Sequence, residues 1–268
     1  ANLPRNPTIP STQIAFDGTA DGEYEFTITA TDIAGKTKNV TRTVLIDTKD
    51  PVLTVTNEGA LTGWIKTPSL SLGGTITDPD PSSGIKSVMY TLTNGAVVDT
   101  QNLSLSGTNW TGNIPLSNGE NQELIITATD FAGNAVSSSS YSFSVDLNLP
   151  VVQKITPTGQ LLTNLKSPIV STFRVTDEGA SGVASVLVTR IGSNSIDVGD
   201  QTSSLSGGIW TISVPTETLD TLTLGSSEVV TVTATDGAGN SSIVTFPIMV
   251  DQDAPNVLTI STPENNAT

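Results

Sequence analysis

The sequence contains no cysteine and no histidine among its 268 residues. Without cysteine the chain can form no disulfide, and it offers no thiolate to a metal ion or a substrate. Without histidine it lacks the usual general base of nucleophilic catalysis and the most common protein ligand of transition metals. These absences argue against enzymes built on Ser/His/Asp or Cys/His arrangements, and we expect no catalytic residues in this chain.

Positive charge is also scarce, because 11 Lys and Arg residues stand against 26 Asp and Glu residues, for a formal net charge of −15. Nucleic acids and anionic membrane surfaces both require a basic face, so neither is expected as a partner. No apolar run reaches the roughly 18 residues of a membrane-spanning helix. Residues 1–10 do not resemble a signal peptide, and we expect the chain to be an interior part of a longer protein.

No segment shows sustained helical periodicity, whereas one short motif occurs three times, at Thr29–Lys36, Thr127–Asn134 and Thr233–Asn240. Each copy reads TATD, then any residue, then Ala-Gly and Lys or Asn. Apolar side chains at every second position precede each copy, which is typical of a half-buried strand. The Asp then leaves the strand and the glycine allows a tight turn. This pattern predicts an all-β fold.

The three motif aspartates, Asp32, Asp130 and Asp236, lie 98 and 106 residues apart (130−32 and 236−130). A repeat of this length matches a whole immunoglobulin-like β-sandwich. We therefore predict tandem immunoglobulin-like domains. The expected boundaries are a partial domain at 1–48 that holds only its C-terminal strands, complete domains at 49–147 and 148–252, and the start of a further domain or a tail at 253–268.

Each repeat ends in a junction with Asp four residues before Pro, at Asp47–Pro51, Asp146–Pro150 and Asp251–Pro255. Proline cannot extend a strand ladder, so it separates the last strand of one domain from the first strand of the next. Linkers of so few residues favour domains that are stacked end to end as a rod, and we expect a monomeric rod.

A second acidic motif recurs inside the two complete domains, where Asp78 and Asp177 each lie 27 residues after the junction proline (78−51 and 177−150). In a sandwich, the loop after the second strand, the loop between the last two strands and the preceding junction lie at the same end. The acids and one amide expected to converge there are Asp47, Asp50, Asp78, Asp80 and Asp130 at the first junction, Asp146, Asn148, Asp177, Glu178 and Asp236 at the second, and Asp251 and Asp253 at a third.

Several carboxylates in a small volume repel one another unless a cation neutralises them. Lys49 lies in the first junction but has no equivalent in the other two. Calcium accepts oxygen ligands in irregular geometry, whereas magnesium requires stricter octahedral geometry, so the pattern favours structural Ca²⁺. The alternative is a set of solvated turn aspartates. An EF-hand beginning at Asp78 is excluded, because Met89 occupies the position of its bidentate glutamate.

The sequence holds three tryptophans. Trp110 and Trp210 recur at the same place in the two complete domains, just before a strand and a proline, which favours core packing. Trp64 has no partner in the later domain, where Leu165 is the nearest residue. We therefore keep Trp64 as a candidate for an exposed contact.

Taken together, the TATDxAGN motif, the D-x-x-x-P junction and the TDxxxSG[IV]xSV motif resemble the bacterial Ig-like repeats of giant calcium-binding adhesins secreted by type I systems. The resemblance implies an extracellular virulence factor on the bacterial surface. It also implies Ca²⁺ at the domain junctions and attachment of the parent adhesin to a host-cell glycan or glycoprotein. The ligands it implies are Asp47, Asp146 and Asp251 in the junctions, Asp32, Asp130 and Asp236 in the last loop, and Asp78 and Asp177 in the second loop.

This chain departs from that pattern at the second junction, where Leu149 replaces Asp50 of the first and Asn148 replaces Asp253 of the third. We therefore expect a weaker second site, or one that uses more main-chain oxygens. Two other readings stay open. One is a carbohydrate-binding or spacer array of a secreted polysaccharide-active enzyme, with glycan binding that depends on Trp64. The other is a plain spacer that binds no metal.

Overall fold

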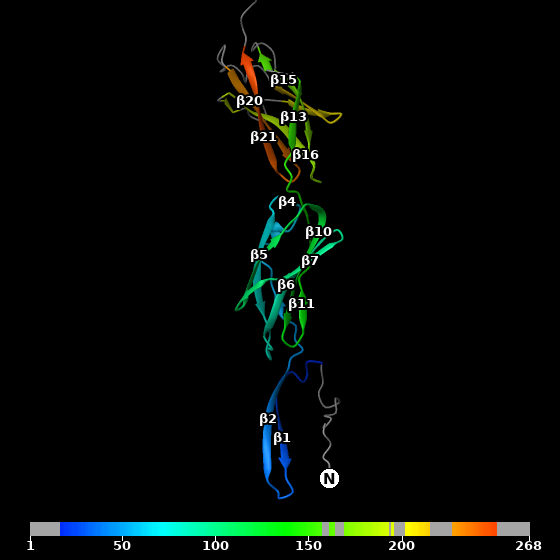
Figure 1. Cartoon of the computed structure of the whole chain (residues 1–268), viewed down its shortest axis with the longest axis vertical. Coiled ribbons are helices and arrows are strands. Elements are labelled where there is room, and N and C mark those ends of the chain that lie inside the picture. The colour runs from blue at the N-terminus through cyan, green and yellow to red at the C-terminus, as the bar shows by residue number, and fades with distance from the viewer. Residues whose placement is uncertain are drawn as a thin grey trace, which may run out of the picture. The chain divides into compact units, whose positions relative to one another are not determined.

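A computed structural model describes residues 17–156, 161–163, 169–192, 194–195, 202–214 and 227–250 (Figure 1). The chain divides into two compact units, Ala1–Val145 and Asp146–Thr268. In the described part of both units the regular structure is β-strand, apart from one 3-10 turn, η2 (Glu58–Ala60). No helix among these residues is long and apolar enough to span a bilayer. The predicted all-β class is therefore confirmed.

The first motif copy lies in a hairpin formed by β1 (Gly22–Thr31) and β2 (Thr37–Ile46). The strands pair antiparallel from Gly22 opposite Ile46 to Thr31 opposite Thr37. At the turn, Asp32 Oδ1 accepts hydrogen bonds from the main-chain N–H groups of Ala34 and Lys36 at 2.9 and 2.8 Å. The predicted strands on both sides of this motif are therefore present.

The first complete domain (residues 52–145) consists of two sheets. One has the strand order β3-β5-β9-β8, and the other has the order β4-β12-β10-β6-β7, with β11 also paired to β10. Only β4 and β12 pair in parallel within this domain. This is the strand order of an immunoglobulin-like sandwich. The strands are β3 (Val52–Leu53), β4 (Trp64–Ile65), β5 (Ser69–Thr77), β6 (Ile85–Asn94), β7 (Val97–Asn102), β8 (Ser104–Ser106), β9 (Asn109–Pro115), β10 (Gly119–Asp130), β11 (Ala135–Ser137) and β12 (Tyr141–Val145).

The second complete domain (residues 151–250) repeats this topology, with the single strand β21 in the place of β11 and β12. Its sheets have the orders β13-β15-β19-β18 and β14-β21-β20-β16-β17. The two domains are therefore tandem immunoglobulin-like sandwiches, as the repeat length predicts. The strands are β13 (Val151–Thr156), β14 (Leu161–Thr163), β15 (Ile169–Thr176), β16 (Val183–Ile191), β17 (Asn194–Ser195), β18 (Thr202–Ser206), β19 (Ile209–Val214), β20 (Ser227–Asp236) and β21 (Ser241–Val250).

The apolar alternation before each motif copy forms part of the core in both complete domains. On β10 the side chains of Leu124, Ile126 and Ala128 are fully buried, and so are their counterparts on β20. Trp110 is 1% exposed, and its indole Nε1 donates a hydrogen bond to the carbonyl oxygen of Thr54 at 3.0 Å. Trp210 is partly buried and packs against the second core. Both tryptophans are core residues, as predicted.

Trp64, the candidate for an exposed contact, lies half-buried on β4, and its role in a contact stays a prediction. It pairs with Ser144 of β12, whereas on β14 Leu162 pairs with Met249 of β21. This register makes Leu162 the counterpart of Trp64. The counterpart expected from the sequence, Leu165, lies outside the described residues. A short parallel strand of this kind has no periodic signal, so its register could not be read from spacing alone.

Candidate metal centre

Three aspartates from separate segments meet in each unit. In the first cluster, Asp47 follows β2, Asp78 follows β5 and Asp130 ends β10, and one carboxylate oxygen from each lies within 4.8 Å of the others. The second cluster consists of Asp146, Asp177 and Asp236 and meets the same condition. The motif and junction aspartates are buried, whereas Asp78 and Asp177 are partly buried.

The TATDxAGN motif positions Asp130 by a closed set of hydrogen bonds. Its Oδ1 accepts from the main-chain N–H groups of Gly133 and Asn134 at 2.6 and 2.8 Å. Gly133 has a φ of 101°, which glycine tolerates far better than other residues. The side-chain amide of Asn134 donates to Asp130 Oδ2 at 2.7 Å and to the carbonyl oxygen of Asp47 at 3.0 Å. One amide thus joins the loop to the junction.

The second domain repeats this link. The Asn240 amide donates to Asp236 Oδ2 at 2.8 Å and to the carbonyl oxygen of Asp146 at 2.9 Å. Sequence reasoning included both asparagines in the motif but assigned them no role in the site. The sequence held one signal for this role, because the first motif copy has Lys36 where the copies of the two complete domains have asparagine.

The junction aspartates are held as ions by main-chain donors. Asp47 accepts hydrogen bonds from the N–H groups of Lys49 and Ser83 at 3.1 and 2.8 Å. Asp146 accepts them from Asn148 and Ser181, whose hydroxyl also donates at 2.5 Å. Burial opposes the charged form of both carboxyls. The hydrogen bonds outweigh this effect and hold the pKa of each below the ordinary value of Asp.

The third aspartate of each cluster has an oxygen without a hydrogen-bond partner. Asp78 Oδ2 accepts from the Ser82 hydroxyl and the Gly84 N–H at 2.8 and 2.7 Å, but its Oδ1 is buried with no donor. Asp177 Oδ1 accepts from Gly179 N–H at 3.1 Å, and its Oδ2 is likewise buried with no donor. An unsatisfied buried oxygen costs about 1–3 kcal/mol, and more when it is charged. The same orphan oxygen in two domains fits a site for a cation.

Electrostatics within the second cluster point the same way. Burial raises the pKa of Asp177, and the negative charges of Asp146 and Asp236 raise it further. The carboxyls thus repel one another when no counter-ion is bound. A divalent cation would remove this repulsion and would also supply a partner for the orphan oxygen.

Several residues predicted for the sites lie outside the clusters. Asp50, Asp80 and Glu178 are exposed and belong to neither group. Asp80 offers its main-chain carbonyl oxygen to Lys49 Nζ, and Asn148 offers its main-chain N–H to Asp146. Spacing places a residue in a loop but does not say which way its side chain points, so metal ligation by Asp50, Asp80, Asn148 and Glu178 stays a prediction.

The remaining predicted residues lie at the ends of the chain. Asp32 is exposed at the hairpin turn and belongs to neither group of acids found among the described residues. Asp251 and Asp253 lie outside the described residues. The third predicted site therefore stays a prediction.

A family model described as a bacterial Ig-like domain matches residues 5–48. A search of curated proteins finds no match. The fibronectin(III)-like modules of Clostridium thermocellum CbhA are 14% identical, with 74% of this chain and 94% of that chain covered and a TM-score of 0.38. The N-terminal eight Ig domains of DSCAM isoform 1.30.30 are 11% identical, with 86% and 32% covered and a TM-score of 0.41. Sequence identities and TM-scores this low support no argument about function. The fold assignment rests on the strand order and on the family match.

Proposed function

We propose that this chain is a calcium-stiffened segment of a bacterial cell-surface or secreted adhesin. It acts as a rigid stalk that displays binding domains toward a host-cell glycan or glycoprotein, or toward another surface. The observation that carries the proposal is the repeated three-carboxylate cluster with its orphan buried oxygen. The family match to residues 5–48 supports the setting, because bacterial Ig-like domains are commonly found in surface or extracellular proteins.

Calcium suits the donor set better than other common cations. The site has carboxylates and no imidazole or thiolate, which disfavours zinc and copper. Calcium takes six to eight oxygen ligands in flexible geometry, so nearby main-chain carbonyls and water can complete its coordination. The chain's own residues that would hold it are Asp47, Asp78 and Asp130 in the first cluster and Asp146, Asp177 and Asp236 in the second.

The position of the clusters in the chain explains why calcium would stiffen it. Asp47 and Asp146 belong to junction segments, whereas the other ligands come from loops of the domain that follows. A bound cation would therefore fasten each junction to the next domain. Extracellular modules of this kind bind calcium at about 10⁻⁴–10⁻³ M. With calcium at one to ten times its dissociation constant, each site contributes about 0.4–1.4 kcal/mol, so the larger effect should be on junction order.

Small-angle X-ray scattering of the chain in millimolar calcium and in excess chelator tests the stalk. We expect the maximum dimension to shrink and the scattering to indicate flexibility once calcium is removed. An identical profile in both buffers would reject calcium stiffening and leave the plain-spacer reading.

Isothermal calorimetry with calcium tests the ligands. Asp78→Asn retains the size of the side chain but removes one charge, and we expect it to abolish binding at the first cluster alone. Asp80→Asn is the matched control, because Asp80 lies two residues away and is exposed outside the cluster. If both variants bind as the unmodified chain does, the assigned ligands are wrong.

A further inference from the structure

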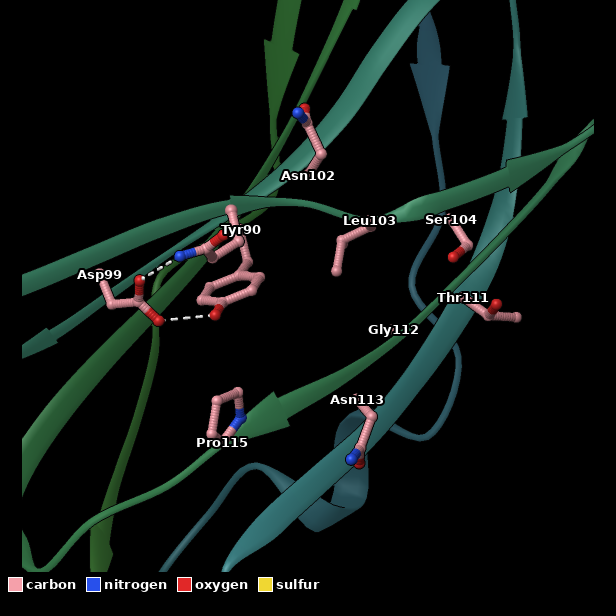
Figure 2. A pocket seen from close by; sticks show the side chains of 10 residues that line it. Tyr90, Asp99, Asn102, Leu103, Ser104, Thr111, Gly112, Asn113 and Pro115 are labelled. Atoms are coloured by element: carbon pink, nitrogen blue, oxygen red, sulfur yellow. Dashed lines mark hydrogen bonds between the residues drawn. The ribbon is translucent and has the colours of Figure 1, made fainter.

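The first domain has an open pocket that its fold does not require. It lies between strands β6, β7 and β9, has a volume of about 390 Å³, and is lined mainly by polar side chains (Figure 2). None of the acids of the first cluster lines it. Its chemistry is therefore separate from the metal centre.

The wall of this pocket differs from the matching part of the second domain at a glycine. Trp110 and Trp210 occupy matching positions on β9 and β19, so Gly112 corresponds to Ile212, which is 1% exposed in the second core. In the first domain Leu103 folds over Gly112, and a Cβ at this glycine would overlap the end of the leucine side chain. The second domain therefore has an isoleucine at the place where the first has a glycine covered by the side chain of Leu103.

A fixed carboxylate lies at one end of the pocket. The hydroxyl of Tyr90 donates to Asp99 Oδ2 at 2.6 Å, and Gln101 Nε2 donates to Asp99 Oδ1 at 3.1 Å (Figure 2). These two hydrogen bonds lower the pKa of Asp99, so the group is ionised at neutral pH. Each carboxylate oxygen can accept more than one hydrogen bond, so Asp99 retains capacity for donors on a ligand.

The rest of the lining is neutral. Asn102, Ser104 and Thr111 bring amide and hydroxyl groups, whereas Leu103 and Pro115 bring apolar surface. A second depression of about 220 Å³ shares Asp99 and Pro115 with the first and adds Leu92, Val97 and Leu116. Because they share these two residues, we refer to the two depressions together as the groove, which has one mainly polar and one more apolar part.

From this arrangement we infer that the groove is a binding site for a neutral saccharide of one or two sugar units. Sugar hydroxyls need closely spaced donors and acceptors, and the C–H faces of a sugar need small apolar surfaces. The groove offers both. The negative charge of Asp99 disfavours anionic sugars, because it would meet a like charge in a partly desolvated site. The inference rests on the proposed attachment function, since it gives the displayed segment a ligand of its own.

Saturation-transfer NMR on the whole chain tests this site. The probes are lactose and N-acetyllactosamine as neutral sugars and N-acetylneuraminic acid as the anionic one. We expect transfer to a neutral probe at millimolar concentration and none to the anionic sugar. Asp99→Asn should weaken neutral-sugar binding by about tenfold, because it removes a charged hydrogen-bond acceptor. Gly112→Ile should abolish binding, because its side chain would displace Leu103, which lines the pocket.

Trp64→Ala serves as the control and should bind as the unmodified chain does, since Trp64 does not line the groove. Amide hydrogen exchange of β9 shows whether Gly112→Ile remains folded, and Asp99→Asn tests the site independently at a half-buried position. The inference is overturned if neither neutral sugar binds, if both groove variants bind normally, or if binding depends on Trp64. Measurements in calcium and in chelator separate this site from the stalk, because saccharide binding should be the same in both.

Discussion

The two complete domains share a strand order and a carboxylate cluster, but they surround the cluster with different charges. In the first, Lys49 Nζ donates to the carbonyl oxygen of Asp80, and its charge helps to lower the pKa of Asp47. The counterpart of Lys49 in the second domain is the neutral Asn148. There, Gly179 packs so closely against Asp146 that a Cβ would overlap the carboxylate. One scaffold thus holds two candidate metal sites of different charge.

This difference changes the expectation for the second site. Its predicted weakness rested on Leu149 and Asn148 in place of acids. The equivalent acid of the first junction, Asp50, is exposed and outside the cluster. The loss of that acid therefore removes no carboxylate from the cluster. Because the second cluster also lacks a lysine, we now propose that it binds calcium more tightly than the first.

The largest expected difference between the domains comes from their cores. Trp110→Ala should destabilise the first domain by about 3–5 kcal/mol, because the side chain is fully buried. Trp210→Ala should cost the second domain less, since Trp210 is only partly buried. Hydrogen exchange followed by mass spectrometry reports each domain separately. Equal losses, or loss of protection in the unmodified domain, would contradict this prediction.

The next effect concerns the asparagines that link loop to junction. Asn240→Ala should destabilise the second domain by about 1.5–3 kcal/mol, because it removes hydrogen bonds to a buried carboxylate and a carbonyl. Asn134→Ala should cost the first domain less, since Asn134 is only partly buried whereas Asn240 is buried. Chemical unfolding in chelator, which removes any contribution from metal, measures both. A larger loss for Asn134→Ala would mean that burial does not set the cost.

A smaller, charge-dependent effect follows from Lys49. Lys49→Asn should raise the calcium affinity of the first cluster by about three- to tenfold, because it removes a nearby positive charge. The reciprocal Asn148→Lys should weaken the second cluster by a similar factor. Calorimetric titration with calcium measures both changes, and Lys86→Asn controls for net charge. Unchanged affinities would show that the lysine does not act on the site.

In chelator, acid pH should act in opposite directions on two carboxyls of the second cluster. The pKa of Asp177 is raised by burial first and by its neighbours second, so its protonated form is favoured in the folded state. The stability that Asp177 contributes to the folded state is therefore fully present below the ordinary pKa of Asp. It is lost as the pH rises through the raised pKa of the folded state. The contribution of Asp146 has the opposite sign, because its pKa is lowered. Asp177→Asn should remove the part of the pH dependence of stability that comes from Asp177, which acid unfolding curves in chelator measure. Near neutral pH this variant should be stabilising in chelator and destabilising in calcium.

The smallest effect is expected at alkaline pH and in the first domain alone. Burial first, and hydrogen bonds to Asp99 and Glu58 second, raise the pKa of Tyr90 and of Tyr141 to about 12. Their stabilising contribution is complete below the ordinary tyrosine pKa of about 10 and is lost as pH rises through about 12. The second domain contains no tyrosine. Fluorescence of variants that keep only Trp110 or only Trp210 follows the alkaline unfolding of each domain separately. Transitions at the same pH in both domains would contradict the assignment of this effect to Tyr90 and Tyr141.

Most of the fold could be predicted because its signals are local. Alternation along β10 and β20 is a property of neighbouring residues, and the turn after Asp130 or Asp236 needs only the glycine and the main-chain donors that follow. The convergence of loops followed from sandwich topology, since alternate loops return to the same end. The short strands β4 and β14 could not be placed, because they pair in parallel with a strand distant in sequence.

The same apolar pattern also behaves differently in different settings. Ile28 of the hairpin is 61% exposed, whereas Ile126, at the corresponding position just before the next motif copy, is 0% exposed. Both residues satisfy the strand pattern. Their burial differs because β10 belongs to a sheet that packs against a second sheet, and a sequence window does not contain that partner.

The sequence by itself determined the repeat, the strands, the turns and the carboxylate positions that recur in each domain, because these depend on neighbouring residues and on topology. Only the tertiary structure decided that Asp78 and Asp177 would each keep a buried oxygen without a donor, and that Asp50 would be exposed outside the cluster. It also decided that Leu103 would cover Gly112 and leave a groove beside Asp99. These features depend on side-chain packing between segments that lie far apart in the chain.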